Sequence, residues 1–302
     1  MKKIILLSIV LFSTLAFAKP VIVVSILPQK TFVQKIAKDM VDVTVMVKPG
    51  SSPHTYEPKA SQMVAISKAD MYFSIGVEFE DVWLDRFKSQ NKGLKFINIS
   101  ANIPKIQMAE HHHHEEHHDE DKHDEDDHDG DHHDDDEEEE HSEIDPHIWT
   151  SPKNVAIMAN TIYIALSKLD PKNKKFYKSN LDDFIKEIDY TNTQIIYALR
   201  DMKPHSKFMV FHPSWGYFAH DYDLEQVAVE VDGKEPKAKE MIMIIEEAKE
   251  EKVKVIFTQP EFSDKSAKMI AKATNVQVQK ITPLDANWSQ NLINMAKIIA
   301  NK

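Results

Sequence analysis

The chain of 302 residues contains no cysteine. Disulfide bonds, lipid attachment through a cysteine and thiolate metal ligands are therefore all excluded. The stability of the folded protein has to come from side-chain packing. Any metal ion has to be bound by imidazole, carboxylate or thioether groups.

Long apolar runs are also missing after residue 18, where no segment approaches the roughly 20 apolar residues that cross a bilayer. The N-terminus differs, because two lysines precede an apolar run over residues 4–17 that ends in an Ala-Phe-Ala pattern. This arrangement is typical of a cleaved signal peptide. We expect residues 1–18 to be removed and the mature protein to be soluble, to reside in the periplasm and to begin at Lys19.

The net charge of −12 is unevenly distributed. Residues 110–141 hold 19 acidic residues and one lysine, a local charge of −18, which leaves +6 for the rest of the chain. The basic residues of that remainder are scattered along the sequence. The charge pattern therefore does not indicate a nucleic-acid-binding surface.

The acidic tract is also rich in histidine, which makes up 11 of its 32 residues. Such a tract cannot bury enough apolar surface to fold, so we expect a disordered insertion that binds several metal ions weakly. A purely solubilising role is the alternative. The accessory metal-binding histidines predicted there are His111, His112, His113, His114, His117, His118, His123, His128, His132, His133 and His141.

Short β-branched runs alternate with stretches of helical period in both halves of the chain, which favours mostly parallel sheets covered by helices. Between the halves, residues 172–203 contain neither glycine nor proline and place their apolar residues on one helical face. The sequence thus predicts an α/β fold of two lobes joined by one long rigid helix. We expect an N-terminal lobe over 19–171, a linking helix over 172–203 and a C-terminal lobe over 204–302.

Three of the five histidines outside the tract lie in proline-flanked loops. His54 ends the sequence Pro-Gly-Ser-Ser-Pro-His, His147 lies in Asp-Pro-His-Ile-Trp, and His212 begins His-Pro-Ser-Trp-Gly-Tyr. His54 and His212 each follow a predicted strand, where open α/β sheets bind their ligands. Three neutral imidazoles from separate loops are a normal set of Zn²⁺ ligands, with a fourth position for a carboxylate or water.

A single loop histidine is more often a turn or hydrogen-bonding residue than a metal ligand. His205 follows the long helix, where a cation would complement the helix dipole. His220 ends an aromatic helical turn. We expect these two histidines to be structural or exposed.

The three histidine loops, together with the Phe-Thr-Gln-Pro-Glu-Phe segment over residues 257–262, resemble the zinc and manganese substrate-binding proteins of ABC transporters. The resemblance is to the high-affinity zinc-uptake type, cluster A-I, and covers essentially the whole mature chain. It implies two lobes with the metal in the cleft between them and delivery of Zn(II) to a membrane permease. Carried onto this sequence, the ligands are His54, His147 and His212.

The resemblance also implies a fourth ligand, since many members have an aspartate in a late loop. Thr282 stands at that position here, and Asp285 follows three residues later. Asp285 either reaches the metal by a different loop path or caps the last helix, in which case water takes the fourth position. A carboxylate ligand would make manganese more plausible, whereas three imidazoles and water suit zinc.

Two functions of other classes remain open from the sequence. A zinc-dependent hydrolase would also use three histidines and a water, with Glu57 or Glu261 near the metal, although either residue could instead support a histidine. However, the chain has no His-Glu-x-x-His motif, nucleophile elbow or phosphate loop, so we do not expect an enzyme. The other alternative is a periplasmic metal buffer without a transporter. We expect a monomer.

Overall fold

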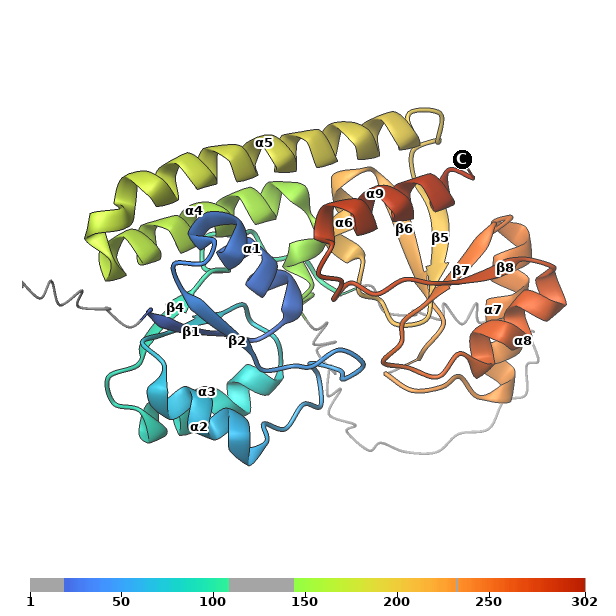
Figure 1. The fold of residues 1–302 in the computed structure, drawn as a ribbon. Coiled ribbons are helices and arrows are strands. Elements are labelled where there is room, and N and C mark those ends of the chain that lie inside the picture. Colours follow the sequence, from blue (N-terminus) through green and yellow to red (C-terminus); the bar gives the residue numbers. More distant parts are fainter. Residues whose placement is uncertain (1–18, 109–143, 232, 302) are drawn as a thin grey trace, which may run out of the picture.

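The computed structural model describes residues 19–108, 144–231 and 233–301. The predicted signal peptide and the eleven histidines of the acidic tract lie outside these residues. Two α/β lobes stand side by side beneath one long helix (Figure 1). The fold class predicted from the sequence is confirmed.

The first lobe contains a four-stranded parallel sheet in the order β2-β1-β3-β4. Helices α2 and α3 cover one face, while α1 and α4 (Pro152–Leu169) lie over the other (Figure 1). The first-lobe elements are β1 (Val21–Val24), α1 (Leu27–Ala37), β2 (Asp42–Val45), α2 (Ala60–Lys68), β3 (Met71–Ser74), α3 (Phe79–Gln90) and β4 (Lys95–Asn98).

The two central strands of this sheet are apolar along nearly their whole length. Every residue of β3 is buried, and only Val21 of β1 is partly exposed. Strands covered by helices on both faces need such continuous apolar runs rather than an alternating pattern. The carboxyl ends of all four strands point toward the second lobe, so the loops that follow them lie at the lobe boundary (Figure 1).

Two long helices follow the first sheet in the chain, and the second of them reaches the second lobe. The 3-10 helix η1 (Ile148–Thr150) leads into α4 (Pro152–Leu169), whose N-cap Ser151 accepts a hydrogen bond from the backbone N–H of Asn154. The 3-10 helix η2 (Pro171–Asn173) then precedes α5 (Lys174–Leu199). At 1.5 Å per residue, the 26 residues of α5 span about 39 Å. This helix runs along the top of both lobes (Figure 1).

The second lobe contains another parallel sheet, in the order β6-β5-β7-β8. Alternate side chains of β5 point to opposite faces of the sheet. Phe208 and Val210 belong to the core shared with the first lobe, whereas Met209 packs against α7 and α8. The second-lobe elements are β5 (Ser206–Val210), α6 (Gly216–Asp221), β6 (Leu224–Ala228), α7 (Ala238–Glu250), β7 (Val255–Thr258), α8 (Lys265–Thr274), β8 (Gln277–Lys280) and α9 (Trp288–Ile299).

Tryptophan side chains join the lobes at the point where the chain enters α9. The Trp288 ring is buried edge-on against Phe32 of α1, and its Nε1 donates to the carbonyl of Trp149 at 2.7 Å. In turn, Trp149 Nε1 donates to the carbonyl of Pro283 at 2.8 Å. These buried contacts favour one fixed arrangement of the two lobes. Among the described residues, no helix combines the length and apolar composition needed to span a bilayer.

Candidate metal centre

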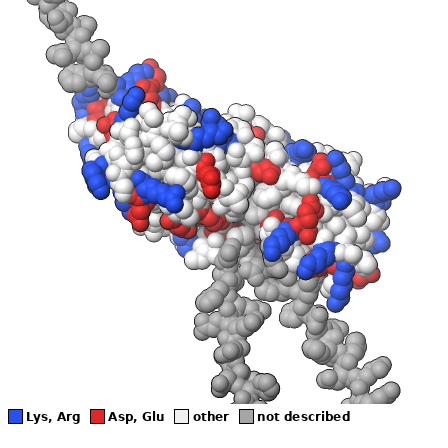
Figure 2. All heavy atoms as spheres, turned by 90° about the horizontal axis from the view of Figure 1, so that it is seen from below, with Lys and Arg blue, Asp and Glu red and all other residues white. Residues whose placement is uncertain are grey.

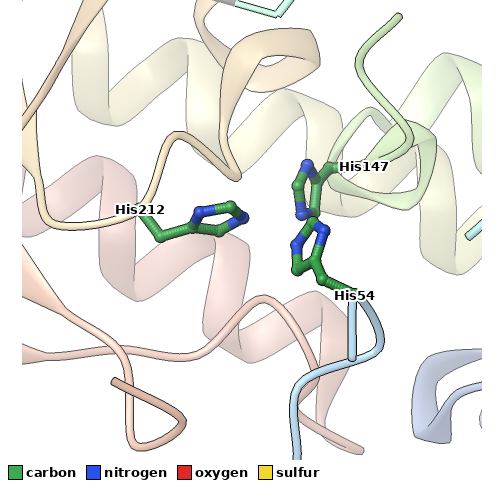
Figure 3. A group of neighbouring side chains, drawn as sticks. All are labelled: His54, His147 and His212. Carbon is green, nitrogen blue, oxygen red and sulfur yellow. The ribbon is translucent and has the colours of Figure 1, made fainter. Parts of the chain in front are cut away.

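The structure brings His54, His147 and His212 together at the boundary between the lobes. One ring nitrogen from each lies within 4.8 Å of the other two, and no other group of three or more His, Cys, Asp or Glu residues in the described part of the chain meets this criterion. The three side chains point toward one another from separate loops (Figure 3). Tetrahedral Zn²⁺ with nitrogen ligands at about 2.0–2.1 Å needs them about 3.3 Å apart, so shifts of about 1 Å would close the site.

Two of the three histidines are positioned by the ends of strands, and the third by the beginning of a helix. His54 lies in the loop between β2 and α2, and His212 follows β5 by two residues. His147 comes from neither sheet, because it is the residue before η1, at the entry to α4. Two parallel sheets that face each other with their carboxyl ends thus bring distant loops to one point, as the binding rule for open α/β sheets requires.

Each imidazole is oriented by its own carboxylate. The Nδ1 atom of His54 lies 2.8 Å from Glu78 Oε1, and that of His147 lies 2.8 Å from Asp145 Oδ1. His212 Nδ1 lies 2.6 Å from Glu230 Oε1. A carboxylate at Nδ1 holds the proton there and leaves the Nε2 lone pair available for a metal ion.

Burial and neighbouring charges shift the pKa values of two groups in the site, His212 and Glu78. Burial is the largest influence on the pKa of His212 and lowers it, with a further decrease from the two neighbouring histidines, although Glu230 acts in the opposite direction. Burial alone would raise the pKa of Glu78. The hydrogen bond and charge of His54 outweigh that effect and lower the pKa of the Glu78 carboxyl.

The backbone around His212 is fixed by a neighbouring amide. Gln259, directly after β7, accepts a hydrogen bond from His212 N–H at 3.3 Å and donates to the His212 carbonyl at 2.8 Å. The Phe262 ring stacks on the imidazole with centroids 4.7 Å apart. His212 Nε2 is buried and has no hydrogen-bond partner among the described residues. A buried nitrogen lone pair without a donor is costly unless a cation occupies the site.

The pocket bounded by the three histidines is small. Its cavity volume of about 10 Å³ is close to the space that a single water molecule needs. The other lining residues are mainly apolar or neutral: Ser52, Pro53, Trp149, Gln259, Glu261, Phe262, Pro283 and Leu284. The arrangement can hold an ion with one water, whereas pockets for small organic ligands are usually several hundred Å³.

The other predicted site residues have different surroundings. The Asp285 carboxylate accepts a hydrogen bond from the backbone N–H of Asn287, the N-cap residue of α9, at 2.7 Å, and Asp285 is not among the residues that line the pocket. Thr282 Oγ1 donates to Glu261, which lines the pocket and has its pKa raised by burial. Glu57 is exposed and is not among the residues that line the pocket.

The two remaining histidines outside the acidic tract lie on the surface. His205 is 70% exposed and lies 3.3 Å from Glu225, while His220 is 68% exposed beside Asp221. Neither belongs to the group of three. Their exposure agrees with the structural or surface role expected from the sequence.

Sequence reasoning missed the three carboxylates that contact the imidazoles, namely Glu78, Asp145 and Glu230. Glu78 and Glu230 come shortly after the carboxyl ends of β3 and β6. An acidic residue just after a predicted buried strand was therefore a usable signal. Asp145 could have been found from its place two residues before His147 in the Asp-Pro-His motif.

A family model described as the periplasmic component A of a zinc-uptake complex, ZnuA, matches residues 22–301. The chain belongs to this family. The resemblance inferred from the histidine loops is thereby confirmed, and the family is one of periplasmic components for metal transport.

Individual relatives agree with this assignment. The chain is 34% identical over 306 residues to the high-affinity zinc uptake system protein ZnuA of Haemophilus influenzae, with 93% of this chain and 90% of that protein covered. It is 28% identical over 282 residues to the zinc-binding protein AdcA of Streptococcus pyogenes, which covers 90% of this chain. The chain spans about half the length of AdcA, because the match covers 52% of that protein.

Solved structures of the same family superimpose on almost the entire chain. A crystal structure of ZnuA has 38% identity and a TM-score of 0.80, and covers 94% of this chain and 99% of its own. A zinc-bound ZnuA with residues 138–173 deleted has 37% identity and a TM-score of 0.79, with 94% and 98% covered.

Proposed function

We propose that this protein captures Zn²⁺ in the periplasm and delivers it to the membrane permease of an ABC transporter. His54, His147 and His212 are the ligands in this proposal. The observation that carries it is the set of three converging imidazoles, each with a carboxylate at Nδ1. The names of the relatives support zinc as the cargo, and the family of uptake components supports a permease as the partner.

The ligand set favours zinc over manganese. Manganese prefers oxygen-rich sites, whereas three imidazoles with one water suit zinc. The carboxylate that would make the site oxygen-rich is Asp285, and its hydrogen bond to Asn287 N–H engages it at the start of α9. Water is therefore the proposed fourth ligand.

The transport proposal is preferred to an enzyme. A hydrolase would use the same three histidines to activate water, but a cavity of about 10 Å³ leaves no room for an organic substrate beside the ion. We expect no turnover of ester substrates and no hydration of CO₂. Nucleic acid is not a proposed partner, because lysines, arginines and carboxylates are interspersed over the face in Figure 2. A monomer is proposed, and size-exclusion chromatography with light scattering tests it.

The experiment that tests the receptor is a zinc titration against a competing chelator. It compares the mature chain from Lys19, a variant lacking residues 110–141, and each of these with His147→Ala. The deletion is practicable because Gln107 and Ile144 pair in an antiparallel bridge, so the two sides of the removed segment are adjacent. We expect one tight site in both parent proteins, and an affinity at least about 100-fold lower after His147→Ala, since even residues that merely orient ligands contribute 10–100-fold.

The titration distinguishes the receptor proposal from the metal-buffer alternative. If tight binding disappears with residues 110–141 and is indifferent to His147→Ala, the receptor proposal is wrong and the buffer is correct. The zinc-bound relative with its own deletion supports the opposite outcome. Delivery to a permease is tested by deleting the gene, which should abolish growth under chelation until zinc is added.

A further inference from the structure

The first residue of α6 contacts the carboxylate that orients His147. A methyl group added at Gly216 would lie 2.2 Å from Asp145 Oδ2 and 3.4 Å from its Cγ. Carbon and oxygen atoms that are not bonded do not approach to 2.2 Å. Residue 216 therefore has to be glycine for Asp145 to occupy its observed position.

Asp145 has little freedom to move away from such a methyl group. It is fully buried, and its Oδ1 accepts hydrogen bonds from both the backbone N–H and Nδ1 of His147, each at 2.8 Å. Its own backbone N–H donates to the carbonyl of Ile106 at 3.0 Å. A displacement of the carboxylate would consequently be transmitted to the His147 ring.

The next residue of α6 holds the stretch of chain that is bonded to Asp145. The Tyr217 hydroxyl donates to the carbonyl of Pro104 at 3.2 Å and accepts from the backbone N–H of Ile106 at 3.3 Å. Ile106 is the residue whose carbonyl binds Asp145 N–H. Tyr217 thus fixes the stretch against which the Asp145–His147 segment is aligned.

We infer that Gly216 and Tyr217 are positioning residues that set the place of His147 in the metal site. They lie four and five residues after His212, so one short segment of the second lobe carries one ligand and orients another. The inference rests on the proposed zinc-binding function. It adds that the second lobe determines the orientation of His147, at the entry to α4. The same segment therefore fixes the position of His147 relative to His212.

The decisive experiment is a double-mutant cycle between Gly216→Ala and Asp145→Ala in the full mature chain. Zinc affinity is measured by competition with a chelator strong enough to exclude weak sites. We expect Gly216→Ala to lower the affinity by about 10–100-fold, the usual effect of disturbing a residue that orients a ligand. In the Asp145→Ala background the methyl group enters the space of the missing carboxylate, so the same substitution should cost less than about threefold.

The control for the added methyl group is Gly93→Ala in the first lobe. A methyl group there would lie 3.5 Å from Asn91 Oδ1, an ordinary contact, and zinc affinity should not change. The methyl group at position 216 would also lie 3.2 Å from Gln226 Nε2. That contact exists in both backgrounds of the cycle, so its effect does not depend on Asp145 and cancels from the coupling.

Cobalt(II) absorption gives a readout that a change in fold stability alone would not move. Loss of one imidazole from a four-coordinate site should change the visible bands of the Co²⁺-loaded protein in Gly216→Ala. The inference is overturned if Gly216→Ala binds zinc like the parent, or if it costs the same factor with and without Asp145. Failure of the proposed function is a different result, because the parent protein itself would then bind no zinc tightly.

Tyr217→Phe provides an independent test if Gly216→Ala does not fold. Removing the hydroxyl frees the segment that aligns Asp145, and we expect zinc affinity to fall several-fold with altered cobalt bands. Tyr222→Phe is the matched control, since its hydroxyl donates to Asn192 Oδ1 on α5 at 2.8 Å. Equal zinc affinities for the two phenylalanine variants would rule out the positioning role of Tyr217.

Discussion

Replacement of Glu230 by glutamine should weaken zinc binding without removing any metal ligand. Glu230 and His212 are both buried, and their Oε1 and Nδ1 atoms are 2.6 Å apart. Glutamine can still accept the hydrogen bond, so the substitution removes the negative charge while keeping the shape. Residues that orient metal-binding histidines typically contribute 10–100-fold to affinity, which corresponds to about 1.4–2.7 kcal/mol.

The pH dependence of this effect has a definite sign. Glu230 raises the pKa of His212 against the dominant lowering by burial, so Glu230→Gln should lower that pKa further. Protons then compete less with zinc for the variant than for the parent. The affinity difference between the two proteins should be largest near pH 7.5 and should narrow as the pH falls toward 5.5.

Chelator competition at several pH values measures the loss of zinc affinity in Glu230→Gln and how this loss changes with pH. The matched control is Glu225→Gln. Glu225 also lies beside a histidine, His205, but the two side chains are 45% and 70% exposed. Exposed pairs of this kind contribute little, so zinc affinity should be unchanged. If Glu230→Gln binds zinc within twofold of the parent while His212→Ala loses binding, the carboxylates do not tune this site.

Three further predictions concern the stability of the fold and the pH dependence of zinc binding. Trp288→Phe should destabilise the fold by about 1–3 kcal/mol in urea unfolding, because the buried carbonyl of Trp149 loses its donor; Trp83→Phe, on the half-buried face of α3, should cost much less. Burial raises the pKa of Glu80 to about 7, above its ordinary 4.5, so its contribution to stability is fully present below pH 4.5 and is lost as the pH rises through 7. Urea unfolding should therefore show the stability gap between the parent and Glu80→Gln narrowing from pH 4.5 to 7, and a constant gap would contradict the shift. Zinc affinity of the parent should be nearly constant from pH 7 to 8 and fall below about pH 6.5, where protons occupy the imidazoles; a steep change above pH 7 in calorimetric titrations would exclude neutral histidines as the ligands.

The alternation of buried strands and helices, and the long helix between the lobes, could be predicted from the sequence. Hydrophobic period and the absence of glycine and proline are local properties, so they can be read without knowing which elements touch. The same holds for the three proline-flanked histidines, because their residue type, and the position of His54 and His212 after predicted strands, already indicated a metal site. The helix ends were less accurate, since α5 covers Lys174–Leu199 rather than 172–203.

Partners distant in sequence were decided only by the tertiary structure. Glu230 contacts His212 because β6 pairs with β5, and Glu78 reaches His54 because β3 belongs to the same sheet as β2. The sequence left Asp285 open as a ligand or a cap, and only the tertiary structure shows that its carboxylate accepts a hydrogen bond from the backbone N–H of Asn287. Side-chain type and backbone period are encoded locally, whereas the contacts of a carboxylate with a distant histidine depend on which strands pair in each sheet, and the meeting of the three histidines depends on how the two lobes pack.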